Sequence, residues 1–142
     1  MKKGFTLLEL IIVVVIIGVL VSFAAPQFAT TKEKALEQEA KANLNLIMAA
    51  EKIYRMEQGQ YYHYNTSTFA HSNSQEIIIA INNDLKLQIP SSTGRSWDYD
   101  LVIDNTVTPQ TACAQAIRVN DANRNWHLTN LDDAPTTGTC GT

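Results

Sequence analysis

The fold of this chain is decided by residues 4–26, GFTLLELIIVVVIIGVLVSFAAP. From residue 5 to residue 25, only Thr6, Glu9 and Ser22 are polar. A helix rises about 1.5 Å per residue, so a helix of this length covers roughly 30 Å, the thickness of a bilayer core. The stretch therefore predicts a membrane-length apolar helix.

Two lysines, Lys2 and Lys3, precede this stretch and favour an N-terminus on the inner side of a membrane. A secretory signal peptide and a plain membrane anchor share this layout. Neither explains Glu9, because an unpaired carboxylate at membrane depth costs several kcal/mol. A cut after Gly4 would give Phe5 a free amine one helical turn before Glu9. That amine, on a neighbouring copy, could neutralise the carboxylate and fix the axial offset between two helices.

The helical pattern continues from residue 27 to residue 58, which contain no Gly or Pro and are rich in good helix formers. An apolar stripe at spacings of three or four is predicted to pack on a sheet. Its members are Leu36, Ala40, Leu44, Ile47, Ala50 and Tyr54, with Leu46 and Ile53 widening it on one side. Glu51 and Arg55 form a favourably ordered i,i+4 pair, as do Glu37 and Lys41. Gly59 is expected to end the helix.

The whole predicted helix, residues 5–58, would be about 80 Å long. No domain of this size buries such a helix alone, so its first half must lie in lipid or among other copies. Gly18 and Pro26 are weak points, because Pro26 lacks a backbone N–H and clashes with the preceding turn. A simple kink at the membrane exit and local melting when helices repack are both compatible with the sequence.

The remaining residues predict a small antiparallel α+β head in which a sheet covers the helix. Residues 60–75 are expected to form a connecting loop, followed by a helix from Ser74 to about Asn83 or, alternatively, a buried strand. Strands are predicted at Trp97–Ile103, Ala114–Val119 and Trp126–Leu131, with a turn at 120–125 and a fourth strand conceivable at Lys86–Ile89. In the second strand, Ile117 and Val119 should face inward and Arg118 outward.

The N-terminal pattern resembles that of type IV pilins and pseudopilins: GFTLLE at residues 4–9, an all-apolar run, then Gly18 and Pro26. The resemblance implies an α+β pilin fold, with a long N-terminal α-helix packed on a small antiparallel β-sheet head. It also implies that a prepilin peptidase cleaves between Gly4 and Phe5 and methylates Phe5. The expected assembly residues are Glu9, Thr6, Gly18 and Pro26.

The same resemblance divides the chain into a leader (1–4), a transmembrane and assembly half of the helix (5–26), an amphipathic stalk (27–58) and a globular head (59–142). The head contains Cys113 and Cys140. An even number of cysteines behind an export segment suggests one disulfide, which would resemble the disulfide-bounded C-terminal region of pilins. Two buried free thiols are the alternative.

Charge and motif content exclude several classes of function. The net charge is −3, and residues 59–142 hold four basic and eight acidic side chains, which disfavours direct binding of nucleic acid. No catalytic constellation emerges, so we expect neither an enzyme nor a cofactor. Asp132 and Asp133 could hold Ca²⁺, since major pseudopilins of type II secretion carry such a site in the head.

The leading hypothesis is a structural subunit that polymerises through its N-terminal helices into an extracellular type IV pilus-like filament. The expected partners are other copies, a prepilin peptidase and inner-membrane assembly machinery, with the precursor held in the inner membrane. A type II secretion pseudopilin is the first alternative. A minor tip subunit for adhesion or DNA uptake is the second, and a non-polymerising anchored sensor is the third.

Overall fold

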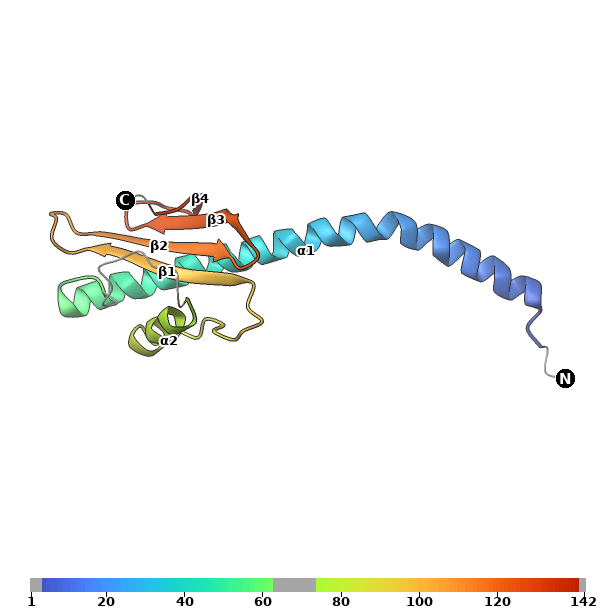
Figure 1. Cartoon of the computed structure of the whole chain (residues 1–142), viewed down its shortest axis with the longest axis horizontal. Coiled ribbons are helices and arrows are strands. Elements are labelled where there is room, and N and C mark those ends of the chain that lie inside the picture. The colour runs from blue at the N-terminus through green and yellow to red at the C-terminus, as the bar shows by residue number, and fades with distance from the viewer. Residues whose placement is uncertain (1–3, 63–73, 141–142) are drawn as a thin grey trace. The chain divides into compact units, whose positions relative to one another are not determined.

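The computed structural model describes residues 4–62 and 74–140. The chain divides into two compact units between Glu37 and Gln38. One helix, α1 (Leu7–Gln58), runs through both (Figure 1). Residues 63–73 of the predicted connecting loop lie outside the described residues.

The second unit is the head, an α+β arrangement of the second half of α1, a short helix and a four-stranded sheet. The sheet is antiparallel with the order β1-β2-β3-β4, and α2 packs on β1 (Figure 1). The element bounds are α2 Ser74–Asp84, β1 Trp97–Asp104, β2 Thr111–Arg118, β3 Asp121–Thr129 and β4 Thr136–Thr137. The predicted fold, a long helix packed on a small antiparallel sheet, is confirmed.

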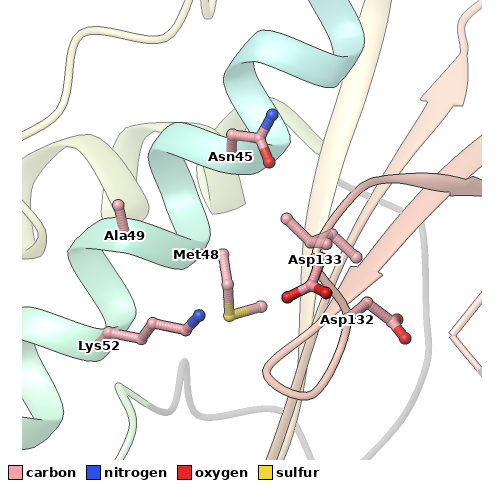
Figure 2. A pocket seen from close by; sticks show the side chains of 7 residues that line it. Asn45, Met48, Ala49, Lys52, Asp132 and Asp133 are labelled. Carbon is pink, nitrogen blue, oxygen red and sulfur yellow. The ribbon is translucent and has the colours of Figure 1, made fainter.

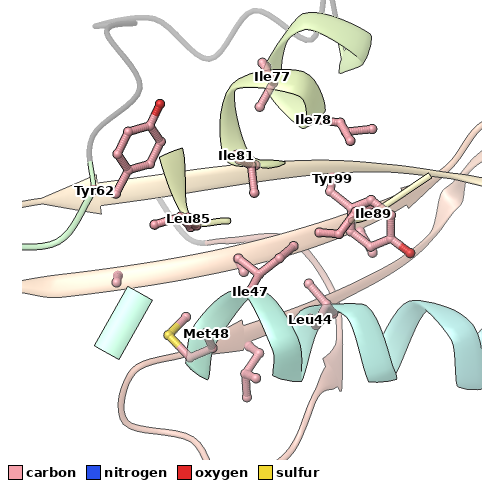
Figure 3. Packing of buried hydrophobic residues seen from close by; sticks show 14 of the residues in the cluster. Leu44, Ile47, Met48, Tyr62, Ile77, Ile78, Ile81, Leu85, Ile89 and Tyr99 are labelled. Carbon is pink, nitrogen blue, oxygen red and sulfur yellow. The ribbon is translucent and has the colours of Figure 1, made fainter. Parts of the chain in front are cut away.

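The core of the head lies between α1, α2 and one face of the sheet (Figure 3). Fully burying one large aliphatic side chain contributes roughly 1.5–3 kcal/mol, so this cluster holds the three elements together. Its innermost members are Ala40, Leu44 and Ile47 of α1, Ile78 and Ile81 of α2, and Trp97, Tyr99, Ala114, Ala116 and Leu128 of the sheet.

The inner face of α1 differs from the predicted stripe on one side. Leu46 and Ile53 are 45% and 53% exposed, so they do not widen the buried face. Met48 and Glu51 are buried instead. The sheet therefore lies on the side of α1 opposite to Leu46, and the predicted pair of Glu51 with Arg55 is not formed because Glu51 turns into the core.

The inward face of β2 is the reverse of the prediction. Ala112, Ala114 and Ala116 point toward the helix, whereas Val119 is exposed in the turn that follows. Small side chains on this face let α1 approach the sheet closely, which the bulk of Ile117 would prevent. The register between β2 and β3 shifts between Ile117 and Arg118, at the end of the strand.

The β2–β3 connection is shorter than predicted. The expected turn at residues 120–125 is a turn at residues 119–120, and β3 begins at Asp121, so five residues of the predicted turn lie in the strand. The register shift accounts for this: Ile117 pairs with Asn125 but Arg118 pairs with Asp121 across a tight turn, so residues 122–124 of β3 have no partner in the β2 register.

The conceivable strand at residues 86–89 is absent, because the end of α2 uses these residues. Lys86 takes a left-handed conformation (φ 57°) and the Leu87 N–H donates back to the Asn82 carbonyl at 3.0 Å. The Asn82 side chain then binds both the N–H and the C=O of Ile89, each at 2.8 Å. These backbone groups are therefore satisfied without a neighbouring strand.

The C-terminal tail crosses the face of the sheet opposite to α1. The Cys140 N–H donates to Gln115 Oε1 at 3.2 Å, and Cys140 forms the predicted disulfide with Cys113. The tail also adds the short strand β4, which the sequence did not predict. The bridge spans 27 residues, which in the chain-entropy account stabilises the fold by about 3–4 kcal/mol.

Candidate functional site

The first turn of α1 is closed by a capping box between Thr6 and Glu9. Thr6 Oγ1 accepts the Glu9 backbone N–H at 3.2 Å, and Glu9 Oε2 accepts the Thr6 backbone N–H at 2.9 Å. Thr6 Oγ1–H also donates to Glu9 Oε2 at 2.8 Å. This reciprocal arrangement satisfies N–H groups that have no partner within the helix, and it starts the helix at Leu7.

The capping box fixes the direction of the Glu9 carboxylate. All its hydrogen bonds within the described residues use Oε2, so Oε1 remains available to a group from outside the chain. The negative charge also lies at the positive end of the helix dipole. The signal for this motif is present in the sequence as Thr-x-x-Glu before an apolar run, although Glu9 was predicted to serve methylation and the register between subunits rather than a cap.

The expected cleavage point lies just outside the helix. Gly4 and Phe5 precede the first helical residue, both are exposed, and the side chain of Phe5 is 83% exposed. No heavy atom within 4 Å would meet a side chain at Gly4. A peptide bond in this setting is accessible to a protease in an extended conformation.

The first unit has no packed core among its described residues. Each large apolar side chain from Phe5 to Phe23 is between 46% and 83% exposed. By length and hydropathy, no single helix of the described chain qualifies to cross a membrane, whereas Leu7–Phe23 and Gln27–Gln58 taken together, with a 43° bend between them, do.

The predicted weak points of α1 lie in different settings. Gly18 is in the middle of the apolar half, with open space where a side chain would be, and Pro26 is in the interval that separates the two bent segments. Hydroxyl groups on both sides of this interval bond back to the helix: Ser22 Oγ–H donates to the Val19 carbonyl at 2.7 Å, and Thr30 and Thr31 both donate to the Gln27 carbonyl at 2.9 Å. Such bonds often accompany helix bending.

A second apolar stripe lies on the outer face of α1 in the head. Leu46, Ile53 and Met56 are 45%, 53% and 78% exposed, and the small residues Ala42 and Ala49 continue the same stripe. Their spacings of four, three, four and three are those of a helix that packs along another helix. The sequence did not predict this face, because Leu46 and Ile53 were expected to widen the buried stripe.

Asp132 and Asp133, the residues named for Ca²⁺, lie at the edge of a small cavity. Both line a cavity of about 210 Å³ between α1 and the turn after β3, together with Lys52, whose ammonium group points into the same space (Figure 2). Asp132 Oδ2 is already engaged by the Thr129 hydroxyl at 2.7 Å. Nowhere in residues 4–62 and 74–140 do three or more His, Cys, Asp or Glu side chains gather as a metal site.

Comparison with known proteins supports the N-terminal interpretation. Residues 1–25 match the family described as the prokaryotic N-terminal methylation motif. The chain is 42% identical over 60 residues to the type IV major pilin protein PilA of Myxococcus xanthus. The aligned residues cover 42% of this chain and 27% of that protein. It is 39% identical over 66 residues to the type II secretion system core protein G of Escherichia coli, covering 46% and 43% of the two chains.

The core protein G of Vibrio cholerae is 41% identical over 60 residues, which is 42% of this chain and 41% of that protein. The matches therefore span less than half the length of each relative. No solved structure matches the chain. The methylation motif includes Thr6 and Glu9, whose geometry is described above, and the head has the predicted helix-on-sheet fold. The chain therefore carries the prokaryotic N-terminal methylation motif and is distantly related, over 60 to 66 residues, to a type IV major pilin and to core proteins G of type II secretion systems.

Proposed function

We propose that the chain is a subunit that polymerises through its N-terminal helices into an extracellular type IV pilus-like filament. The observation that carries this proposal is the first half of α1, whose large apolar side chains are all about half exposed or more. Leaving that surface in water is costly at about 25 cal/mol per Å², so lipid must cover it first and other copies afterwards.

Processing precedes assembly in this proposal. Residues 1–4 are the leader, residues 5–26 the transmembrane and assembly half of the helix, residues 27–58 the stalk, and residues 59–142 the head. A prepilin peptidase removes the leader, and inner-membrane machinery draws the subunit out of the membrane. The exposed bond after Gly4 suits that cleavage.

Glu9 sets the register between subunits. Its Oε2 is held by Thr6, which leaves Oε1 to receive the amine that cleavage frees on Phe5 of a neighbouring copy. A charged pair in an apolar surrounding is far stronger than one in water, so helices that dock out of register would leave both charges unpaired. The outer stripe of Leu46, Ile53 and Met56 extends the same helix contact into the head.

A type II secretion pseudopilin is the alternative that a specific observation favours, because the core proteins G are 39% and 41% identical to the chain over the aligned residues. A pseudopilin would form a short periplasmic filament by the same helix contacts. The bridge Cys113–Cys140 favours the pilin assignment. Filaments found on the outside of cells would separate the two.

The test is a Glu9→Ala variant, examined by electron microscopy of sheared cell-surface material and by mass analysis of the subunit N-terminus. We expect long filaments with methylated Phe5 from the wild type. In the variant we expect none, although the monomer still enters the membrane. Glu39→Ala, which removes an exposed carboxylate from the stalk, is the matched control and should assemble normally. Wild-type filament yield from Glu9→Ala would refute the proposed register.

A further inference from the structure

Glu51 is the only carboxylate in the described chain that is completely buried, at 0% exposure. Its Oε2 accepts the backbone N–H of Tyr62 at 2.9 Å. Its Oε1 is buried without any hydrogen-bond partner. An unsatisfied buried oxygen costs about 1–3 kcal/mol, so its presence in a packed core calls for an explanation. Tyr62 belongs to residues 59–62, which leave α1 and are called the exit segment below.

The exit segment is fastened to the head by polar contacts at both of its tyrosines. The Asn105 side chain binds Tyr61 on both sides, accepting its N–H at 3.2 Å and donating to its C=O at 3.1 Å. The Tyr62 hydroxyl donates to Asp84 Oδ2 of α2 at 2.5 Å. Asn105 and Asp84 hold the segment from the β1 and α2 sides. From α1, Glu51 accepts the Tyr62 backbone N–H, and the Tyr54 ring packs edge-on against the Tyr62 ring, with 5.6 Å between the centroids. Figure 3 shows Tyr62 beside the end of α2, near Leu85.

The two cations of α1 nearest to Glu51 in sequence do not neutralise it. Arg55, one turn later, donates to the Tyr61 hydroxyl at 3.2 Å and lies over the Tyr61 ring at 4.9 Å. Lys52 points into the cavity beside Asp133 (Figure 2). No salt bridge to Glu51 occurs within the described residues.

The titratable groups at the exit segment also include Asp84 and the phenols of Tyr54, Tyr61 and Tyr62. The Tyr62 phenol donates its proton to Asp84, and the Tyr61 phenol accepts from Arg55. Burial raises the pKa of Glu51 to about 7, and the Tyr62 N–H opposes this only in part. The Glu51 carboxyl therefore changes charge near neutral pH, whereas an exposed glutamate is already ionised there.

We propose that Glu51 is a protonation-controlled fastening of the exit segment, which the neutral carboxyl keeps on the head and the ionised carboxyl loosens. A buried carboxylate without a cation costs several kcal/mol, and water can reduce that cost only by reaching Glu51. Release of the Tyr62 N–H from Oε2 opens that route. Because Asn105 and Asp84 still hold the segment, the change stays local and the core of the head remains packed.

The experiment follows the full-length chain in detergent micelles by NMR between pH 5 and pH 9. The Glu51 carboxyl carbon reports ionisation, and hydrogen exchange at the Tyr62 amide, expressed as protection relative to an unstructured peptide, reports the fastening. We expect the carbon to titrate near pH 7 and the protection to fall about tenfold or more across the same interval. Titration near the ordinary value of 4.5, or protection that does not change with pH, would overturn the proposal.

Two substitutions sharpen the result. Glu51→Gln keeps the size and the carbonyl acceptor but cannot ionise, so protection at Tyr62 should be high and independent of pH. Glu57→Gln removes an exposed carboxyl six residues later on the same helix and should leave the wild-type pH dependence unchanged. A pH-dependent loss that survives Glu51→Gln would assign the effect to another group and exclude Glu51. If Glu51→Gln does not fold, the wild-type titration alone decides.

Discussion

Glu9 and Glu51 lie on the same helix in opposite surroundings. Glu9 is exposed, and its carboxylate closes the first turn through Thr6, in a unit whose apolar side chains have no cover. Glu51 is fully buried under the head, with one oxygen bonded to Tyr62 and the other unsatisfied. The apolar side chains of the first half of α1 are thus exposed, whereas the second half is covered by residues of its own chain.

Substitution of two isoleucines, one on each face, gives the strongest test of the difference between the covered and uncovered faces of α1. Ile47 is fully buried in the core, so Ile47→Ala should reduce the free energy of unfolding of the head by roughly 2–5 kcal/mol. Ile53 is 53% exposed, so Ile53→Ala should change it by less than about 0.5 kcal/mol. Chemical denaturation of the detergent-solubilised chain, monitored by tryptophan fluorescence, measures both.

The same pair separates stability from assembly. Ile53→Ala should lower filament yield if the outer stripe is a contact between subunits, although the monomer is as stable as the wild type. Equal losses of monomer stability for the two variants would show that the inner and outer faces of α1 are wrongly assigned. Normal filament yield from Ile53→Ala would restrict assembly to the first half of the helix.

The pH dependence of stability is the next largest expected effect. The folded-state pKa of Glu51 is raised from 4.5 to about 7, so the folded chain binds the proton more tightly than the unfolded chain. The stabilisation from this group is fully present below pH 4.5 and is lost as the pH rises toward 7, by roughly 3 kcal/mol at most. Unfolding by denaturant at a series of pH values measures it.

Glu51→Gln should flatten that part of the profile and leave the remaining pH dependence in place. The variant is therefore expected to be more stable than the wild type at pH 8 and not at pH 4.5. A wild-type profile that rises between pH 4.5 and pH 7, with the same slope in Glu51→Gln, would contradict the assignment of a raised pKa to this residue.

Periodicity predicted the elements of this fold better than their faces. The long helix and its end beside Gly59, the short helix from Ser74 and the presence of three main strands all follow from local patterns. The inward face of β2 does not follow from them. Alanines occupy that face because α1 lies close to it, and a prediction from side-chain size alone places the larger residues inward.

Glu51 shows the same limit from the other side. Its spacing from Arg55 is that of a solvent-exposed ion pair, and nothing local reveals that the sheet covers this side of the helix. The candidate site at the N-terminus was easier to predict from the sequence, because a carboxylate such as Glu9 stands out in an apolar stretch. The capping box also has a sequence signature, Thr-x-x-Glu at residues 6–9.

The smallest predicted effect concerns Thr6, the partner that distinguishes Glu9 from Glu51. Thr6→Ala removes the hydroxyl that bonds both the Glu9 N–H and Oε2, and loss of such a cap costs about 1 kcal/mol. We expect faster amide exchange in the first turn of α1 and a filament yield that is reduced but not abolished. Thr6→Ser keeps the hydroxyl and should restore both. If Thr6→Ala eliminated filaments as completely as Glu9→Ala, the two residues would act as one unit in assembly, and orientation of Glu9 by its own chain would be as essential as its charge.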